Sequence, residues 1–443
     1  MTSYFADHAW LGGDTTSADV LIEVDGAAIT SVRSGAARPP EAVHLRGATL
    51  PGLANAHSHA FHRALRGRTQ RGGGSFWTWR EQMYFVADRL TPDSYYALAR
   101  ATYAEMALSG ITCVGEFHYL HHGPGGVPHA DANAMGTAVV TAAADAGIRI
   151  TLLDTCYLTG GIREPLTGPQ LRFGDRDADS WGSRAAGLQP AAHVRVGAAI
   201  HSIRAVPAAQ LRPVVEWVAQ RQAPLHVHLS EQRAENEASV AAYGCTPTQL
   251  LHDHGVLGPH STAVHATHLD GSDIALLGNS RTTICLCPTT ERDLADGIGP
   301  GRALADAGSP LSLGSDSNAA VDLWEEARGV EMHERLRSGT RGHWDAAALL
   351  RAATVDGHAS LGWPEAGRLA IGAPADFVTV DTDSVRMAGA DPSTLLESVV
   401  FAATATDVLE VVVAGRRVVR EGRHALVDDV PAALASSIAA VVS

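Results

Sequence analysis

The sequence predicts an α/β fold in which eight parallel strands close into a (β/α)8 barrel, joined to a small β-sandwich built from both chain ends. Three observations support this. From Leu50 onward, apolar β-rich runs alternate with capped helical stretches; the runs number eight; and both ends of the chain are β-rich and broken by Gly and Asp turns. The 443 residues, 45% of them hydrophobic, suffice for a barrel as one large unit. We expect residues 1–49 and 363–443 to form the sandwich and residues 50–362 the catalytic barrel.

The elements follow in order along the chain. Ala18–Val24 and Ala27–Val32 are the first β-rich patches. The expected barrel strands are Thr49–Ala56, Thr112–Phe117, Ile148–Asp154, Val194–Ile200, Leu225–Leu229, Thr262–His265, Thr282–Cys287 and Leu311–Gly314. Two of the helices between them have clear ends, because Thr91-Pro92 and Thr246-Pro247 are start signals and Gly110 and Gly255 are stop signals. Late strands are expected over Ala375–Val380 and Val408–Val413, with a turn at Gly415.

Charge and composition restrict the partners. A net charge of -14 argues against nucleic acid or an anionic membrane as a partner. No window resembles a membrane span, and Met1–Trp10 lacks the order of a signal peptide. The five cysteines are scattered, so no disulfide framework is implied, and Cys285 and Cys287 are interpreted as buried thiols. A cytoplasmic enzyme fits these features.

Polar side chains stand where five of the predicted strands end, at the barrel face that carries active sites. His57 and His59 follow the first strand, and alternation turns them to the same face. The other strand ends supply His201, His228 with Glu231, His265, and Asp316. For any single residue, a satisfied structural role is at least as plausible as metal binding, but the group as a whole predicts a divalent metal site. The chain contains no lysine, so a carbamylated lysine bridging two ions is excluded and one metal is expected.

These motifs resemble the amidohydrolase superfamily over nearly the whole chain. The resemblance is carried by Pro51–His59, His228–Glu231, His265–His268, Gly314–Asp316 and Gly372–Phe377. In the deaminase branch, it implies that one divalent metal, Zn²⁺ by expectation, is held by His57, His59, His228 and Asp316. It further implies that Asp316 acts as the base, that Glu231 protonates the substrate nitrogen, and that His265 is catalytic. By the same resemblance His226 and His268 are not part of the chemistry.

A narrower resemblance, to formimidoylglutamate deiminases, is carried by Ser75–Tyr84, Glu116–Tyr119 and His201–Arg204. These enzymes of histidine degradation convert N-formimidoyl-L-glutamate to N-formyl-L-glutamate and ammonia. The implied substrate is thus a small dicarboxylate, and arginine suits carboxylates because its planar fork binds both oxygens. The residues expected to bind it are Arg80, Tyr119, His201, Arg204 and His62. Such enzymes usually have glutamine where this chain has His62, so the role of His62 stays open. A homodimer is expected.

Two other interpretations stay open. The chain could be another deaminase of the same fold, acting on guanine, an adenosine derivative or a triazine. It could also be a non-catalytic barrel that serves as a scaffold, although the complete set of ligand residues argues against this. Without the resemblance, surface salt bridges of Arg80 and Arg204 are the less favoured alternative to substrate binding.

Overall fold

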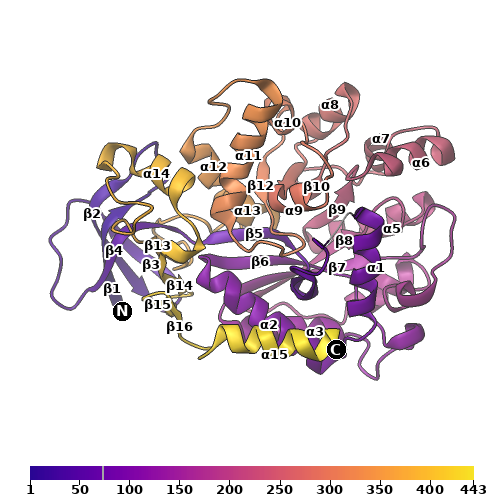
Figure 1. Ribbon diagram of the computed structural model, residues 1–443, viewed down its shortest axis with the longest axis horizontal. Coiled ribbons are helices and arrows are strands. Elements are labelled where there is room, and N and C mark those ends of the chain that lie inside the picture. Colours follow the sequence, from indigo (N-terminus) through magenta and orange to yellow (C-terminus); the bar gives the residue numbers. More distant parts are fainter. Residues whose placement is uncertain (72–73) are drawn as a thin grey trace.

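The computed structural model describes residues 1–71 and 74–443 and contains two eight-stranded sheets (Figure 1). One sheet is the predicted parallel barrel, with neighbouring strands in chain order. Its strands are β5 (Leu53–Ser58), β6 (Ile111–His118), β7 (Arg149–Cys156), β8 (Val194–Ile200), β9 (Leu225–Leu229), β10 (Ser261–His265), β11 (Thr283–Leu286) and β12 (Leu311–Leu313). A parallel bridge between Ser58 and Asp316 brings the last strand back to the first. The prediction of a (β/α)8 barrel is confirmed.

Helical segments connect the strands, and many of them cover the outside of the barrel (Figure 1). They are η1 (Ala60–Leu65), α1 (Phe76–Ala87), α2 (Pro92–Leu108), η2 (Pro124–Gly126), α3 (Ala134–Ala146), η3 (Gly168–Arg172), α4 (Ala178–Ala185), α5 (Ala208–Arg221), α6 (Arg233–Tyr243), α7 (Pro247–Asp253), α8 (Gly271–Asn279), α9 (Pro288–Asp293), α10 (Gly301–Ala307), α11 (Leu323–Ser338), α12 (Ala346–Ala353) and α13 (Val355–Ser360). The predicted starts of α2 and α7 are confirmed, since the side chains of Thr91 and Thr246 cap these helices. None of the helices in the described part of the chain is long and apolar enough to cross a membrane.

The second sheet joins both chain ends. It contains β1 (Thr2–Ala9), β2 (Ser17–Asp25), β3 (Ala28–Arg33), β4 (Val43–Pro51), β13 (Phe377–Val380), β14 (Val408–Val413), β15 (Arg416–Arg420) and β16 (Arg423–His424), in the order β16-β15-β14-β13-β4-β1-β2-β3. The sheet folds over its own core: Ala28, the first residue of the edge strand β3, pairs with Pro374, which comes shortly before β13 in the middle of the strand order. Inside it, the rings of Tyr4 and Phe377 meet edge to face at 5.0 Å. The predicted sandwich from both ends is confirmed.

The predicted first barrel strand, Thr49–Ala56, is wrong in one respect, because two strands occupy this segment. Its first residues belong to β4, where Leu50 pairs with Val378 of the second sheet, and only β5 enters the barrel. The chain changes sheets at Gly52. A Cβ there would lie 2.2 Å from the Thr112 side chain, so only glycine fits. The sequence analysis missed this change of sheet because the end of β4 and the start of β5 form one continuous apolar run.

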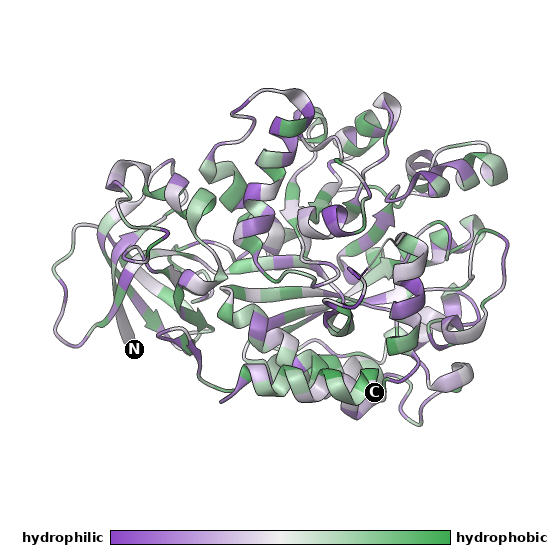
Figure 2. Ribbon diagram, viewed as in Figure 1, coloured by the Kyte–Doolittle hydropathy of each residue, from purple (hydrophilic) through white to green (hydrophobic). Residues whose placement is uncertain are grey.

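The C-terminal region contains two helices that the sequence analysis did not assign, together with η4 (Pro392–Thr394) and η5 (Ala405–Asp407). They are α14 (Leu395–Ala402) and α15 (Val430–Val442). The predominantly hydrophobic α15 lies along α2 on the outside of the barrel (Figures 1 and 2). A buried ion pair also joins the two sheets, with Arg149 Nε 2.6 Å from an Asp376 carboxylate oxygen.

Candidate active site

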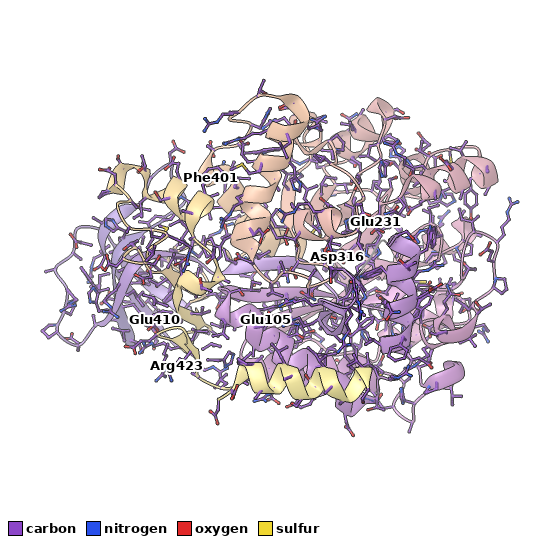
Figure 3. The ribbon with its side chains drawn as sticks, viewed as in Figure 1. Glu105, Glu231, Asp316, Phe401, Glu410 and Arg423 are labelled. Atoms are coloured by element: carbon purple, nitrogen blue, oxygen red, sulfur yellow. The ribbon has the colours of Figure 1, made fainter. Side chains whose placement is uncertain are left out.

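The side chains predicted from the strand ends gather at one end of the barrel. Figure 3 places Glu231 and Asp316 in the barrel, well away from Glu410 and Arg423 of the second sheet. His57, His59, His228, His265 and Asp316 are all buried, and all but His57 line one pocket together with Glu231. The barrel therefore brings together residues that lie up to 259 positions apart in the sequence.

A buried amide network holds the first and last strand ends together. The Asn55 amide accepts a hydrogen bond from Ser315 N (2.9 Å) and donates one to Ser315 Oγ (2.7 Å). The Asn318 amide donates to the carbonyl oxygen of His59 (2.9 Å) and accepts from Ser315 Oγ (2.6 Å). Because all these groups are buried and paired, they fix Asp316 relative to His57 and His59.

Three of the strand ends have left-handed backbone conformations. Ser230, His265 and Asp316 have φ angles of 49°, 69° and 43°. Such conformations are costly for residues other than glycine, and they persist where the surrounding structure fixes them, often at functional sites. Here they turn the chain sharply at the point where each catalytic candidate leaves its strand.

Two histidines are held in a single tautomer by backbone carbonyls. His59 Nδ1 lies 2.9 Å from the carbonyl oxygen of Phe117, and His228 Nδ1 lies 2.9 Å from that of His201. A carbonyl can only accept, so Nδ1 carries the proton in both rings and Nε2 carries a lone pair. This is the arrangement by which proteins orient metal-binding histidines.

The distances between these lone-pair atoms fit a tetrahedral ion. His57 Nε2 is 3.1 Å from His228 Nε2 and 3.3 Å from Asp316 Oδ1, and His59 Nε2 is 3.4 Å from the same oxygen. Ligands about 2.0–2.1 Å from a zinc ion at tetrahedral angles are about 3.3–3.4 Å apart. Acceptor atoms this close repel one another unless a cation lies between them. His57 thus belongs to two close groups of ligand atoms, one with His59 and Asp316 and one with His228 and His265, and residues of these groups are suited to a divalent metal.

The protonation states agree with this fit. Burial lowers the pKa values of His57, His59 and His228, so the rings are neutral and able to bind a metal. Burial alone would raise the pKa of Asp316, but the neighbouring histidines, above all His57, lower it and keep the carboxylate ionised.

A second group, His118, His121 and Asp154, is less suited to a metal. Its ligand atoms are also close together, but Arg184 donates to both oxygens of Asp154 at 2.9 Å and already neutralises the carboxylate. His121 Nδ1 is 4.0 Å from Asp154, wider than the spacing of tetrahedral ligands.

His265 stands between carboxylates beside the metal group. Its Nε2 is 3.8 Å from Asp316 Oδ2 and 3.9 Å from Glu231 Oε1, while its Nδ1 is 3.5 Å from Glu291 Oε1. Burial disfavours the charged ring, but Glu231 and the other two carboxylates outweigh it and raise the pKa of His265 well above its usual value. Burial also raises the pKa of Glu231. The pair can thus hold a proton near neutral pH.

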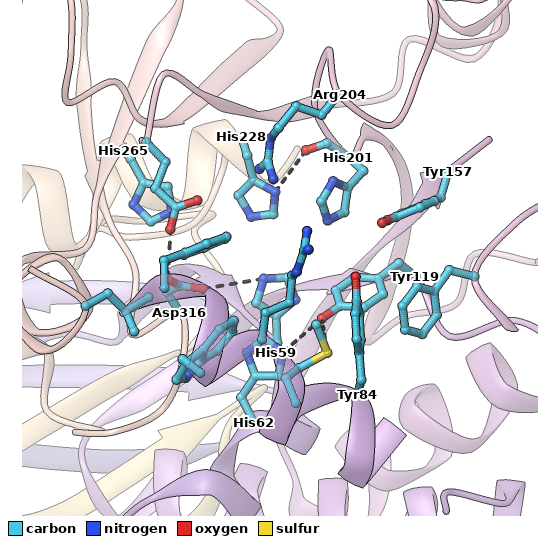
Figure 4. A pocket seen from close by; sticks show the side chains of 17 residues that line it. His59, His62, Tyr84, Tyr119, Tyr157, His201, Arg204, His228, His265 and Asp316 are labelled. Atoms are coloured by element: carbon cyan, nitrogen blue, oxygen red, sulfur yellow. Dashed lines mark hydrogen bonds and ion pairs between the residues drawn. The ribbon is translucent and has the colours of Figure 1, made fainter. Parts of the chain in front are cut away.

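The predicted substrate-binding residues line the same pocket. Figure 4 shows His265 and Asp316 on one side and Tyr84, Tyr119 and Tyr157 on the other, with Arg204 close to His228. The pocket combines charged, polar and aromatic side chains, the mixture expected for a small polar ligand. The predicted residues in its wall are Arg80, Tyr119, His201, Arg204 and His62.

The two arginines have different surroundings. Arg80, on α1, lies over the rings of Trp77 (4.4 Å) and Tyr84 (5.6 Å) and forms no hydrogen bond or salt bridge with any described residue. Arg204 donates from Nε to Glu235 Oε2 at 3.1 Å. Within the described part of the chain, Arg80 therefore presents an unpaired cation to the pocket, whereas Arg204 is already paired on one side.

His62 and Tyr119 form a pair of their own, with His62 Nε2 2.8 Å from the Tyr119 hydroxyl. Burial lowers the pKa of His62 to about 3, so the ring is neutral. His62 thus contributes to the pocket wall, and its role in substrate binding stays a prediction.

The structure also shows pocket residues that the sequence analysis did not assign. Tyr157 directly follows β7, and the sequence predicts this strand. Its position after the strand could therefore have identified it as a residue of the active face. Glu291 lies in α9, where no local pattern marks it, and only the fold brings it to His265. His226 lies apart from the pocket and contacts the carbonyl oxygen of Ser360 at 2.9 Å, as expected of a structural residue.

Comparisons with known proteins cover most of the chain. The model of a family described as the amidohydrolase family matches residues 48–418. The chain is 35% identical to a formimidoylglutamate deiminase of Pseudomonas aeruginosa, over 96% of both proteins. It is 29% identical to a 5-methylthioadenosine/S-adenosylhomocysteine deaminase of Pelotomaculum thermopropionicum, over 85% of this chain and 81% of the relative. It is 30% identical to an 8-oxoguanine deaminase of Pseudomonas aeruginosa, over 79% of this chain and 78% of the relative.

Solved structures extend the comparison. The crystal structure of an amidohydrolase from Brucella melitensis superposes with a TM-score of 0.93 at 32% identity, with both chains fully covered. A zinc-containing atrazine chlorohydrolase from Arthrobacter aurescens has a TM-score of 0.88 at 24% identity, again over both whole chains. At that identity the second likeness concerns the fold alone.

Proposed function

The chain belongs to the amidohydrolase family, and from this premise we propose that it hydrolyses N-formimidoyl-L-glutamate to N-formyl-L-glutamate and ammonia. It is a hydrolytic enzyme of the family's deaminase type. The choice among deaminase substrates is our proposal, because relatives named for purine-type substrates also match much of the chain.

The observation that carries the proposal is the pair of arginines in the pocket that holds the metal group. Arg80 and Arg204 line this pocket, and Arg80 has no carboxylate partner among the described residues. A half-buried cation without a counter-ion favours an anionic ligand. Formimidoylglutamate supplies a hydrolysable amidine and two carboxylates, one on the carbon that carries the amidine nitrogen and one at the end of the side chain.

The site residues divide the chemistry as follows. His57, His59, His228 and Asp316 would hold one divalent cation, Zn²⁺ in our proposal, which would lower the pKa of water so that hydroxide forms near neutral pH. Asp316 accepts the proton of the attacking water. Glu231 delivers a proton to the amidine nitrogen. As the C–N bond breaks and the formyl carbonyl forms, the proton held by Asp316 passes to the same nitrogen, which leaves as ammonia, and the remaining proton of the attacking water restores Glu231.

His265 fits a supporting role between these two carboxylates. Its Nε2 lies at a similar distance from Asp316 and from Glu231. From there it can hydrogen-bond to the attacking oxygen and stabilise the charge that develops on it. Glu291, on the other ring nitrogen, orients the imidazole and supports its protonated form.

Ammonia release tests the proposal directly. The purified, metal-analysed protein is assayed with formimidoylglutamate, formimidoylglycine, guanine and 5-methylthioadenosine, and Glu231→Gln serves as the control for contaminating activity. We expect formimidoylglutamate to have a kcat/KM at least 100-fold above the other three. A purine with the highest kcat/KM would replace this function with that of another deaminase of the family.

A further inference from the structure

Behind Arg204 lies a buried carboxylate to which the mechanism gives no role. Glu235 stands in the first turn of α6, is 2% exposed and does not line the pocket. Its Oε2 accepts the hydrogen bond from Arg204 Nε at 3.1 Å. A guanidinium has five N–H donors in one plane. With Nε occupied by Glu235, the two terminal nitrogens stay available to the pocket.

The other oxygen of Glu235 contacts the catalytic turn. Oε1 accepts a hydrogen bond from the backbone N–H of Ser230 at 3.3 Å. Ser230 has a left-handed φ of 49° and directly precedes Glu231 in the chain. One buried carboxylate therefore contacts both the arginine of the pocket wall and the strained turn that carries the proton donor.

We propose that Glu235 is a positioning residue that fixes the plane of the Arg204 guanidinium toward a substrate carboxylate and also holds the turn carrying Glu231. This rests on the proposed function, in which Arg204 binds the glutamate end of the substrate. Two effects follow. Loss of the Arg204 contact weakens substrate binding, and loss of the Ser230 contact slows turnover.

Glutamate suits this position because both of its oxygens accept. Glutamine has the same shape but only one acceptor oxygen, and its NH₂ group would face a second donor. Glu235→Gln thus breaks one of the two contacts while keeping the volume of the side chain. An ordinary structural ion pair would instead affect folding alone, and this difference is measurable.

The test is a double-mutant cycle with Glu235→Gln and Arg204→Met, read as KM and kcat for formimidoylglutamate. In the wild-type background we expect Glu235→Gln to raise KM about tenfold or more and to lower kcat, in the range for a hydrogen bond to a charged group. In the Arg204→Met background, the effect on KM should vanish and the loss in kcat should persist. Metal content should equal that of the wild type throughout.

The matched control is Glu237→Gln, an exposed glutamate on the same helix, which should change neither constant. Equal effects of Glu235→Gln on KM in both backgrounds would overturn the inference, as would an unchanged KM in the wild-type background.

Binding of glutarate, measured by calorimetry, separates this inference from the proposed function. Glutarate has two carboxylates and no reactive amidine. If Glu235→Gln weakens glutarate binding and the weakening is lost in the Arg204→Met background, the link between the two residues is supported even if formimidoylglutamate is not turned over. Equal Kd values for wild type and Glu235→Gln would reject the link even if formimidoylglutamate proves to be the substrate.

Discussion

Replacing Arg80 with methionine should remove substrate recognition without weakening the fold. Arg80 forms no ion pair with any described residue, and its contact with Trp77 is a cation–π contact at a partly exposed site, worth about 0.5–1 kcal/mol. We therefore expect the free energy of unfolding to fall by less than about 1 kcal/mol. Arg204→Met would behave differently, because it removes the ion-pair partner of the buried Glu235, at a cost of about 3–5 kcal/mol.

The loss of catalytic efficiency in Arg80→Met can be estimated from how far the Arg80 side chain is exposed. Truncating one partner of a buried, hydrogen-bonded charge pair costs about 2–5 kcal/mol, and the half-buried Arg80 belongs at the low end of this range. A loss of about 2–3 kcal/mol corresponds to a fall in kcat/KM of roughly 30- to 150-fold for formimidoylglutamate. Lysine at position 80 should rescue this only in part, since a point charge does not reproduce the planar fork.

The assay compares kcat/KM for formimidoylglutamate and formimidoylglycine, together with urea denaturation. Arg89→Met is the matched control, because Arg89 lies just beyond the same helix, on the Phe85 ring and outside the pocket. The loss should be much smaller for formimidoylglycine, whose single carboxylate can use at most one arginine. Equal losses on the two substrates, or strong destabilisation by Arg80→Met, would refute the assignment of Arg80 to a substrate carboxylate.

Three further predictions follow from the site. Alanine at His57, His59, His228 or Asp316 should abolish activity and reduce bound metal, measured by elemental analysis; a His228→Ala protein with normal metal content and turnover would contradict the ligand set. Glu231→Gln should lower kcat by roughly 100-fold or more while metal content stays normal, and unchanged turnover would remove Glu231 from the mechanism. Burial raises the pKa of Glu116 to about 7, above its ordinary 4.5, so the protein should lose up to about 3 kcal/mol of stability as the pH rises from 4.5 to 7. Denaturation at pH 5 and pH 8 should show that Glu116→Gln removes most of this loss, and an equal loss in the variant would disprove a protonated Glu116.

Local patterns were enough to predict the barrel and the residues at its strand ends. A parallel barrel places every strand terminus on one face, so His57, His228 and Asp316 could be grouped without knowing any contact. The same logic failed at Gly52, where the chain passes from one sheet to the other inside a continuous apolar run. Apolar strands look alike in the sequence, whichever sheet they join.

The residues that support the site could not be predicted in the same way. Glu235, Glu291 and Asn318 act through tertiary contacts with residues that lie elsewhere in the chain, and each has an ordinary local interpretation as part of a helix or a turn. Sequence patterns identify side chains that several strands deliver to one place. They do not identify single side chains whose partner is set by the packing of helices around the barrel.

The different surroundings of Arg80 and Arg204 bear on how this pocket would discriminate between substrates. Arg204 is neutralised in part by Glu235, whereas Arg80 has no counter-ion among the described residues. A dicarboxylate would relieve the cost of that partly desolvated charge. A neutral purine would cover Arg80 without pairing it, so binding would carry the full cost of the buried cation. Arg80 would thus act against purines as well as in favour of dicarboxylates, and an unpaired polar group discriminates more strongly than a missing apolar contact. On this argument, Arg80→Met should reduce the preference for dicarboxylates over purines in two ways. It should lower kcat/KM for formimidoylglutamate, and it should leave unchanged or raise any residual activity on 5-methylthioadenosine.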